Sequence, residues 1–149
     1  MYWVRFKYEQ LMKITECYNL KMRQASRVLT NHYDAYLREE GITVTQFSVL
    51  RAIWYLKSIS QKDLQEVLVL QQTTLTRNLK PLIRDGYIEI TSAPDDGRIK
   101  LVSLSDSGRA LFEQSRKKWK KAQDNLSKQL GGQLSEQLLS VADAIIALD

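Results

Sequence analysis

The feature of this sequence that most limits its possible folds is one short β-hairpin inside a chain of helices. Ile88 and Ile90 alternate with polar neighbours in YIEIT (residues 87–91), which predicts a strand. The turn segment SAPDDG (92–97) and a second predicted strand, RIKLVSL (98–104), follow it. Elsewhere the apolar residues recur at helical spacing. We therefore expect a mainly α fold with a small β-hairpin.

Helix signals precede the hairpin. Residues 5–39 are expected to form one or two long helices that end near Gly41. Thr43 and Gln46 have the spacing of a capping box, which predicts the start of the next helix. Ser60 is placed to cap a short helix that follows.

After a brief break at 69–71, a helix is predicted over residues 72–84, with one apolar stripe and one polar face. Pro81 removes a backbone hydrogen bond and is expected to kink this helix. The stripe consists of Leu75, Leu79, Leu82 and Ile83.

Two further helices are predicted after the hairpin, over 106–129 behind a Ser105 cap and over 133–148. A short helix, a tight turn, a polar-faced helix and a hairpin, in this order, form a winged helix-turn-helix. We expect residues 41–105 to form this winged lobe. Residues 1–40 and 106–149 are expected to form a helical dimerisation region, because their apolar residues have little else to pack against in a small domain. The predicted fold is thus a winged helix-turn-helix with N- and C-terminal dimerisation helices.

Composition narrows the class of protein further. The chain has 149 residues, 44% of them hydrophobic, which is enough for one domain with a buried core. A single cysteine, no signal peptide and no membrane-spanning apolar run make a cytoplasmic protein without membrane contact the expectation. The net charge of +5 mildly favours an anionic partner, but residues 59–104 carry six basic and six acidic side chains.

Several motifs of the sequence resemble those of the MarR family of bacterial transcription regulators. The wing pattern of that family matches Asp96-Gly97-Arg98, Leu104-Ser105 and Gly108. TTLTRNLKPLIRDGYI (73–88) is similar to its recognition helix, and GITVTQFSVL (41–50) resembles the start of an earlier helix. The resemblance covers roughly residues 20–130. The chain departs from the family at Ser105, where Thr is usual, and at Val69 and Gln71, where Gly and a stronger capping residue are common.

The resemblance implies that Arg98 at the wing tip enters a DNA minor groove, with Asp96 pairing to hold its guanidinium and Gly97 permitting the turn. The alternative is a surface ion pair with no DNA role, worth at most about 1 kcal/mol.

The same resemblance places the N-terminal half of the helix over 72–84 in a major groove, where its polar side chains contact bases and phosphates. A solvated helix face is the alternative. Ser60 and Gln61 are candidates for positioning the duplex backbone, although a plain N-cap accounts for Ser60 equally well. The candidate DNA-binding residues of the helix are Gln72, Thr73, Thr74, Thr76, Arg77 and Lys80.

A small aromatic or anionic effector, lodged between the dimerisation helices and the lobe, is implied by the resemblance. Candidate lining residues are Tyr33, Tyr36 and Trp54, which core packing explains as well. The basic run RKKWKK (116–121) is interpreted as a solvated helix face, with Trp119 packed against other helices or a partner chain.

Cys17 has two interpretations. Some members of the family sense organic peroxides through one reactive cysteine in the first helix, and CYNLKMRQASR (17–27) is similar to that segment with a longer spacing. We expect a buried, inert thiol instead, because nothing nearby would expose or acidify it. His32 is interpreted as a packing or surface residue.

No catalytic residue, metal site or cofactor is predicted, since one cysteine and one histidine nearly exhaust the nucleophile and base pairs and no Gly-rich phosphate loop is present. The expected function is that of a homodimeric repressor that binds a pseudo-palindromic operator in double-stranded DNA and is released by a small ligand. The alternatives are a thiol-based oxidant sensor that uses Cys17, and a protein-interaction module without DNA binding.

Overall fold

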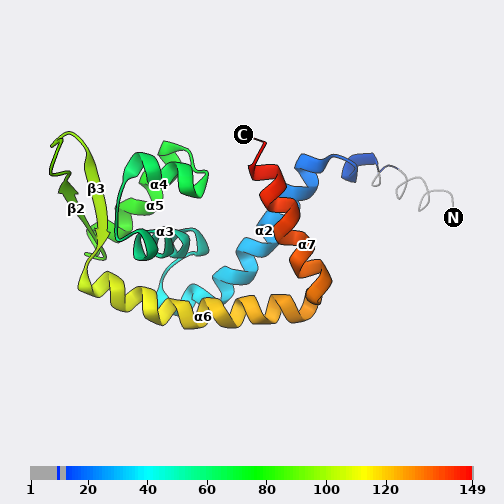
Figure 1. Cartoon of the computed structure of the whole chain (residues 1–149). Coiled ribbons are helices and arrows are strands. Elements are labelled where there is room, and N and C mark those ends of the chain that lie inside the picture. Colours follow the sequence, from blue (N-terminus) through cyan, green and yellow to red (C-terminus); the bar gives the residue numbers. More distant parts are fainter. Residues whose placement is uncertain (1–9, 11–12, 149) are drawn as a thin grey trace.

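The protein consists of a winged lobe (residues 41–105) and a helical arm (residues 18–40 and 132–148), joined by one long helix (residues 106–130; Figure 1). The computed structural model describes residue 10 and residues 13–148. Figure 1 shows the lobe over the first half of α6, with α2 and α7 over its second half. In chain order the elements are α2 (Tyr18–Leu37), η1 (Arg38–Glu40), α3 (Val44–Leu56), β1 (Ser58–Ser60), α4 (Gln61–Leu68), α5 (Gln72–Arg84), β2 (Ile88–Ser92), β3 (Lys100–Leu104), α6 (Asp106–Leu130) and α7 (Gly132–Ile146).

The predicted helix caps are confirmed. The Thr43 hydroxyl accepts a hydrogen bond from the Gln46 N–H (3.3 Å), and the Gln46 side chain accepts one from the Thr43 N–H (2.9 Å). The Ser60 hydroxyl accepts from the Asp63 N–H at the start of α4 (3.1 Å). Each cap satisfies an N–H group that the first helical turn leaves without a partner, which fixes where the helix begins.

The expected two-stranded hairpin is part of a three-stranded sheet of order β1-β3-β2. The prediction of an isolated pair of strands was therefore incomplete. β1 pairs antiparallel with β3, and Ile59 of β1 lies opposite Val102, with both side chains buried. Three residues are too few to show an alternating pattern, so β1 depends on a partner strand some forty residues away.

The turn between α4 and α5 is closed by a left-handed residue. Val69 has φ 50° and ψ 47°, and its N–H donates to carbonyls in the last turn of α4. α5 then runs without interruption from Gln72 to Arg84 with Pro81 inside it. The predicted break and the predicted helix are both present at the expected residues.

The hydrophobic core lies in the lobe and includes the first half of α6. Phe112 of α6 stacks on Phe47 of α3, with ring centroids 5.6 Å apart, and lies 4.9 Å from the ring of Trp54. Trp119 continues this stack at 5.8 Å from Phe47, and the Arg51 guanidinium sits 4.4 Å above the Trp119 ring. Trp119 thus packs between helices, as predicted.

Three of the five cations around Trp119 are paired with acids of the same chain. Arg116 lies 3.6 Å from Glu113, and Lys120 lies 2.9 Å from Asp124. Lys118 binds Glu39 of η1. These pairs fit the interpretation of RKKWKK as a solvated helix face.

The arm leaves apolar surface uncovered. No described residue of α7 is buried, although α7 is the more apolar of the terminal helices. No helix in the described part of the chain is long and apolar enough to cross a membrane. The exposed apolar side chains of the arm include Tyr18, Met22, Val28, Leu134, Leu139, Val141, Ile145, Ile146 and Leu148.

Candidate nucleic-acid interface

α5 has one face in the core and one face in solvent. Leu75, Leu79 and Leu82 are buried against the lobe, which turns the polar residues outward. Thr74 is half-buried and its carbonyl accepts a hydrogen bond from the Asn78 side chain (2.8 Å). The exposed candidates are Gln72, Thr73, Thr76, Arg77 and Lys80. The exposed set contains two cations and three hydrogen-bonding polar side chains, which suits contacts to phosphates and base edges.

The wing tip holds Arg98 in solvent. Its side chain is 94% exposed, and its Nε lies 3.4 Å from an Asp96 carboxylate oxygen. The same Asp96 oxygen accepts the Arg98 backbone N–H (3.0 Å), which fixes the turn. Gly97 has neither a left-handed φ nor a close neighbour, so the backbone here would accept other residues as well as glycine. Asp96 shapes the tip through its hydrogen bond to the Arg98 backbone.

A groove of about 600 Å³ separates the start of α4 from the wing. α4 contributes Ser60, Gln61, Lys62 and Asp63 to its lining, and the wing contributes Arg98 and Lys100. The structure therefore brings Ser60 and Gln61 together with Arg98. The Ser60 hydroxyl is engaged with Asp63 both as acceptor and as donor (2.7 Å to the carboxylate), which agrees with its interpretation as a plain N-cap. Three cations around a concave surface suit a polyanion.

The Leu-Ser-x-x-Gly part of the wing motif joins the end of α5 to the start of α6. The Ser105 and Ser107 hydroxyls both donate to the carbonyl of Gly86 (2.6 and 2.9 Å). The Ser105 hydroxyl also accepts the N–H of Gly108 (3.0 Å), which confirms the predicted cap. A Cβ atom on Gly108 would lie 2.0 Å from the backbone oxygen of Tyr87. Only glycine allows this approach, so the motif residues hold the end of α5 against the start of α6.

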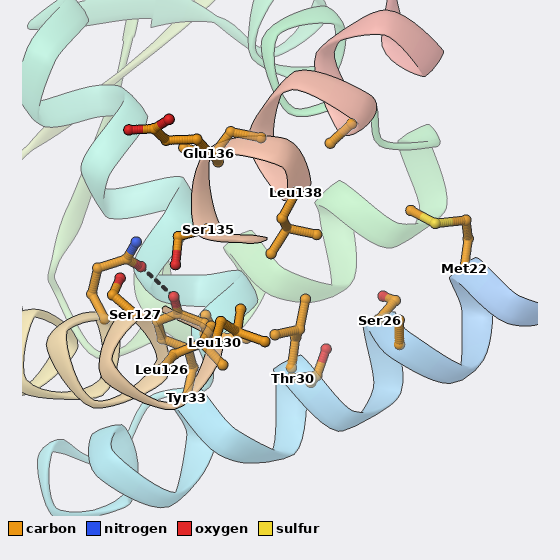
Figure 2. A pocket seen from close by; sticks show the side chains of 16 residues that line it. Met22, Ser26, Thr30, Tyr33, Leu126, Ser127, Leu130, Ser135, Glu136 and Leu138 are labelled. Atoms are coloured by element: carbon orange, nitrogen blue, oxygen red, sulfur yellow. Dashed lines mark hydrogen bonds between the residues drawn. The ribbon is translucent and has the colours of Figure 1, made fainter. Parts of the chain in front are cut away.

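A second groove, of about 510 Å³, lies between α2, α6 and α7 (Figure 2). Tyr33 lines it and donates its hydroxyl hydrogen to the Gln123 side chain, the bond drawn in Figure 2. Burial raises the pKa of the Tyr33 hydroxyl, and the nearby Arg51 charge partly opposes that shift. Among the described residues that line this groove, Glu136 is the one with a charged side chain.

The other two effector candidates lie elsewhere. The Tyr36 ring packs against His32, with ring centroids 5.4 Å apart, and Trp54 belongs to the stack in the lobe core. Neither is among the residues that line the groove. His32 itself donates from Nε2 to the carbonyl of Ala122 (2.9 Å), which joins α2 to α6.

Cys17 is exposed at the N-cap position of α2 and makes no side-chain cap bond. The expectation of a buried thiol is therefore wrong, because residues 16–19 at the start of α2 are all exposed. Among the described residues, no three potential metal ligands cluster.

Sequence reasoning did not single out Asp34. Its carboxylate accepts the N–H of Val44 (2.6 Å), the first residue of α3, from a position on α2. No local pattern marks this contact, because cap and capped helix belong to different elements.

The recognition helix, the turn before it and the three-stranded wing define a winged helix-turn-helix protein. A family model described as the MarR family matches residues 42–100, which covers the lobe from α3 to the start of β3. The chain belongs to the MarR family of transcription regulators.

Individual relatives agree with this assignment. The multiple antibiotic resistance protein MarR of Salmonella typhimurium is 38% identical over 92 residues, 62% of this chain and 61% of that protein. The matches span about half to three fifths of the length of such curated relatives. The M. tuberculosis regulator MosR, solved in complex with DNA, is 30% identical with a TM-score of 0.76, and the match covers 89% of this chain and 98% of MosR. A variant of Escherichia coli MarR complexed with operator DNA is 27% identical with a TM-score of 0.78, over 88% and 96% of the two chains.

Proposed function

We propose that this protein is a homodimeric repressor that binds a pseudo-palindromic site in double-stranded DNA. The observation that carries the proposal is the groove between α4 and the wing, where Lys62, Arg98 and Lys100 surround a concave surface. The exposed face of α5 supplies Arg77 and Lys80 for the adjacent major groove. The two DNA-bound relatives of the same fold support this mode.

The test is fluorescence anisotropy with the intergenic DNA that flanks the gene, measured at several salt concentrations. Wild-type protein should bind tightly and lose affinity steeply with salt, with a slope of about −0.9 per neutralised phosphate. Arg98→Ala should bind much more weakly, since it removes the minor-groove contact. Lys117→Ala, which removes an exposed cation of α6, is the matched control and should bind like wild type. Flat, salt-insensitive signals would instead favour an interaction module without DNA binding.

α5 permits a sharper division of roles. Arg77→Ala should relax the preference for one base pair, because a bidentate base contact is worth about 1–3 kcal/mol of discrimination. Lys80→Ala should weaken binding to all DNA sequences alike. It should also reduce the slope of log affinity against log salt concentration by about 1. Both side chains are exposed, so neither change should disturb the core.

The homodimer is proposed from the uncovered arm. Apolar faces of this extent on a soluble chain mark interaction surfaces. A second copy offers the same exposed residues of α2 and α7, which a two-fold axis would bring face to face. The two recognition helices would then meet successive major grooves, about 34–36 Å apart.

We also propose that an effector binds the groove between α2, α6 and α7. Its volume of about 510 Å³ lies in the range of small-molecule sites. Because Glu136 is the charged residue of the described lining, the proposal narrows to a neutral or cationic aromatic molecule and leaves anions aside. Calorimetry with an aromatic amine should show binding that weakens in Glu136→Gln. Ala142→Leu should fill the groove and abolish binding, whereas loss of the dimer in that variant would mean that the second copy occupies the groove.

The exposure of Cys17 supports an oxidant response as the second candidate. Peroxide would then release DNA from wild-type protein but not from Cys17→Ser. Release from both proteins, or from neither, would exclude a switch at this thiol.

A further inference from the structure

A carboxylate joins α2 of the arm directly to α3 of the lobe. Asp34 lies on α2, in the arm, and Val44 begins α3, the central helix of the lobe. The Asp34 carboxylate accepts the Val44 N–H at 2.6 Å, a distance typical of a strong bond to a charged acceptor. A helix of the arm thus caps a helix of the lobe.

The other caps of α3 are local to the lobe. Thr43 and Gln46 satisfy each other's N–H groups within the capping box. Asp34 serves the next N–H and adds a negative charge at the positive end of the α3 dipole. α3 would therefore begin at the same residue without Asp34, but its direction relative to α2 would lose this constraint.

Both partners of the contact are firmly held on their own sides. On α2, the neighbours of Asp34 tie the helix to α6: His32 bonds the Ala122 carbonyl and Tyr33 bonds Gln123. On α3, Phe47, Leu50 and Ile53 are buried in the lobe core. Because α2 and α3 also both pack on α6, the Asp34–Val44 bond is a further restraint on the angle between them.

We infer that Asp34 is a positioning residue that sets the angle between lobe and arm, and with it the spacing of the two recognition helices. The inference rests on the proposed DNA-binding dimer. The groove between α2, α6 and α7 is lined by Tyr33 and Val44, the residues beside and opposite Asp34. An occupant of the groove therefore touches both sides of the joint, which gives it a direct way to change the lobe angle.

The first test measures the angle itself and requires no DNA. Spin labels at Arg27→Cys on α2 and Glu66→Cys on α4, in a Cys17→Ser background, report the arm-to-lobe distance by double electron–electron resonance. Both positions are exposed, and dilution with unlabelled chain removes distances between copies. We expect a narrow distribution in the parent and a broader or shifted one in Asp34→Ala, with partial recovery in Asp34→Asn, whose amide oxygen still accepts a hydrogen bond.

Thr43→Ala is the matched control, since it removes a cap of the same helix that does not reach the arm. It should lower the melting temperature without broadening the distance distribution. An unchanged distribution in Asp34→Ala, or an equal broadening in Thr43→Ala, would overturn the inference.

The second test measures DNA affinity. Asp34→Ala should weaken operator binding by about tenfold, within the usual range of coupling between sites. The salt slope should stay unchanged, because the phosphate contacts remain the same. Wild-type protein that fails to bind DNA would remove the proposed function, and the spin-label result would still decide the role of Asp34. Unchanged affinity in Asp34→Ala, with wild type binding normally, would show that the lobe angle does not control binding.

Discussion

Val69 occupies a backbone conformation that β-branched residues rarely adopt. It is 61% exposed and closes the helix-turn-helix turn at φ 50°. A side chain in this region costs about 1–2 kcal/mol, because Cβ approaches the following carbonyl oxygen. Val69→Gly should therefore stabilise the protein by about 0.5–1 kcal/mol, after the greater flexibility of glycine in the unfolded chain is subtracted. Chemical denaturation measures the change.

Val67→Gly provides the control for that substitution. Val67 is 56% exposed but lies inside α4, where glycine costs about 1 kcal/mol relative to a good helix former. The two variants should thus shift the free energy of unfolding in opposite directions. A loss of stability in both would mean that the turn is not strained at Val69.

Gly108 is the residue at which the wing motif tolerates no side chain. An added Cβ would lie 2.0 Å from the Tyr87 backbone oxygen, and backbone cannot move aside cheaply. Gly108→Ala should destabilise the protein by about 2–3 kcal/mol or more, as overpacking does. Gly97→Ala on the wing, with no neighbour within 4 Å, should be close to neutral. Equal melting temperatures for the two variants would contradict the close approach.

At the scale of elements, η1 and α6 are joined by the Glu39–Lys118 ion pair. The hydrogen bond from Lys118, followed by its charge, lowers the pKa of the Glu39 carboxyl. A depressed carboxyl pKa stabilises the folded state above the pKa of the unfolded chain, about 4.3 for Glu, and this contribution disappears as the pH falls through the folded value. The gain is small because the Glu39 side chain is 74% exposed to solvent.

Glu39→Gln should accordingly be less stable than wild type at neutral pH and equal to it at strongly acidic pH. Urea denaturation at pH values from about 3 to 7, a range that includes the ordinary Glu pKa, measures the free energy of unfolding of both proteins. Glu66→Gln on α4 serves as the control and should run parallel to wild type. A constant offset between Glu39→Gln and wild type at every pH would rule out the charge as the cause.

Elements held by local hydrogen bonds were predictable from the sequence, and contacts between distant segments were not. The caps at Thr43, Ser60 and Ser105 each involve residues three apart, so their signals lie within one turn. β1 was missed because its three residues gain strand geometry only from β3. The wing and the α5 face followed from motif and periodicity.

The arm shows the same limit for the candidate site. Tyr33 contacts Gln123, which is 90 residues away in the sequence. No sequence pattern near either residue indicates the groove that both line. Trp54 was a reasonable effector candidate as an aromatic residue, yet the lobe core accounts for it through Phe112. Asp34 was missed for the same reason, since its partner lies on another helix.

For the whole molecule, the proposed dimer makes DNA affinity depend on the arm. Val141→Glu places a charge on the uncovered face of α7, where the wild-type side chain is 53% exposed. We expect sedimentation velocity to show monomers and the operator affinity to fall by at least tenfold, because the second half-site loses its high effective concentration. Ser140→Glu, on the adjacent exposed position, is the control. If the wild-type protein were monomeric in solution and still bound the operator tightly, the two-fold dimer model would be wrong.

α6 is a single helix of 25 residues with no proline, and its two ends contact different parts of the molecule. At 1.5 Å per residue it is about 38 Å long, so it acts as a lever. Its first turn is held next to the wing by the hydrogen bond of Ser105 and the close packing of Gly108. Its last turn leads into α7. A tilt of roughly 5° at the arm would swing the wing end by about 3 Å over that length. That displacement is about the length of a hydrogen bond, so a small tilt of the arm would be enough to move Arg98 out of its proposed contact with DNA.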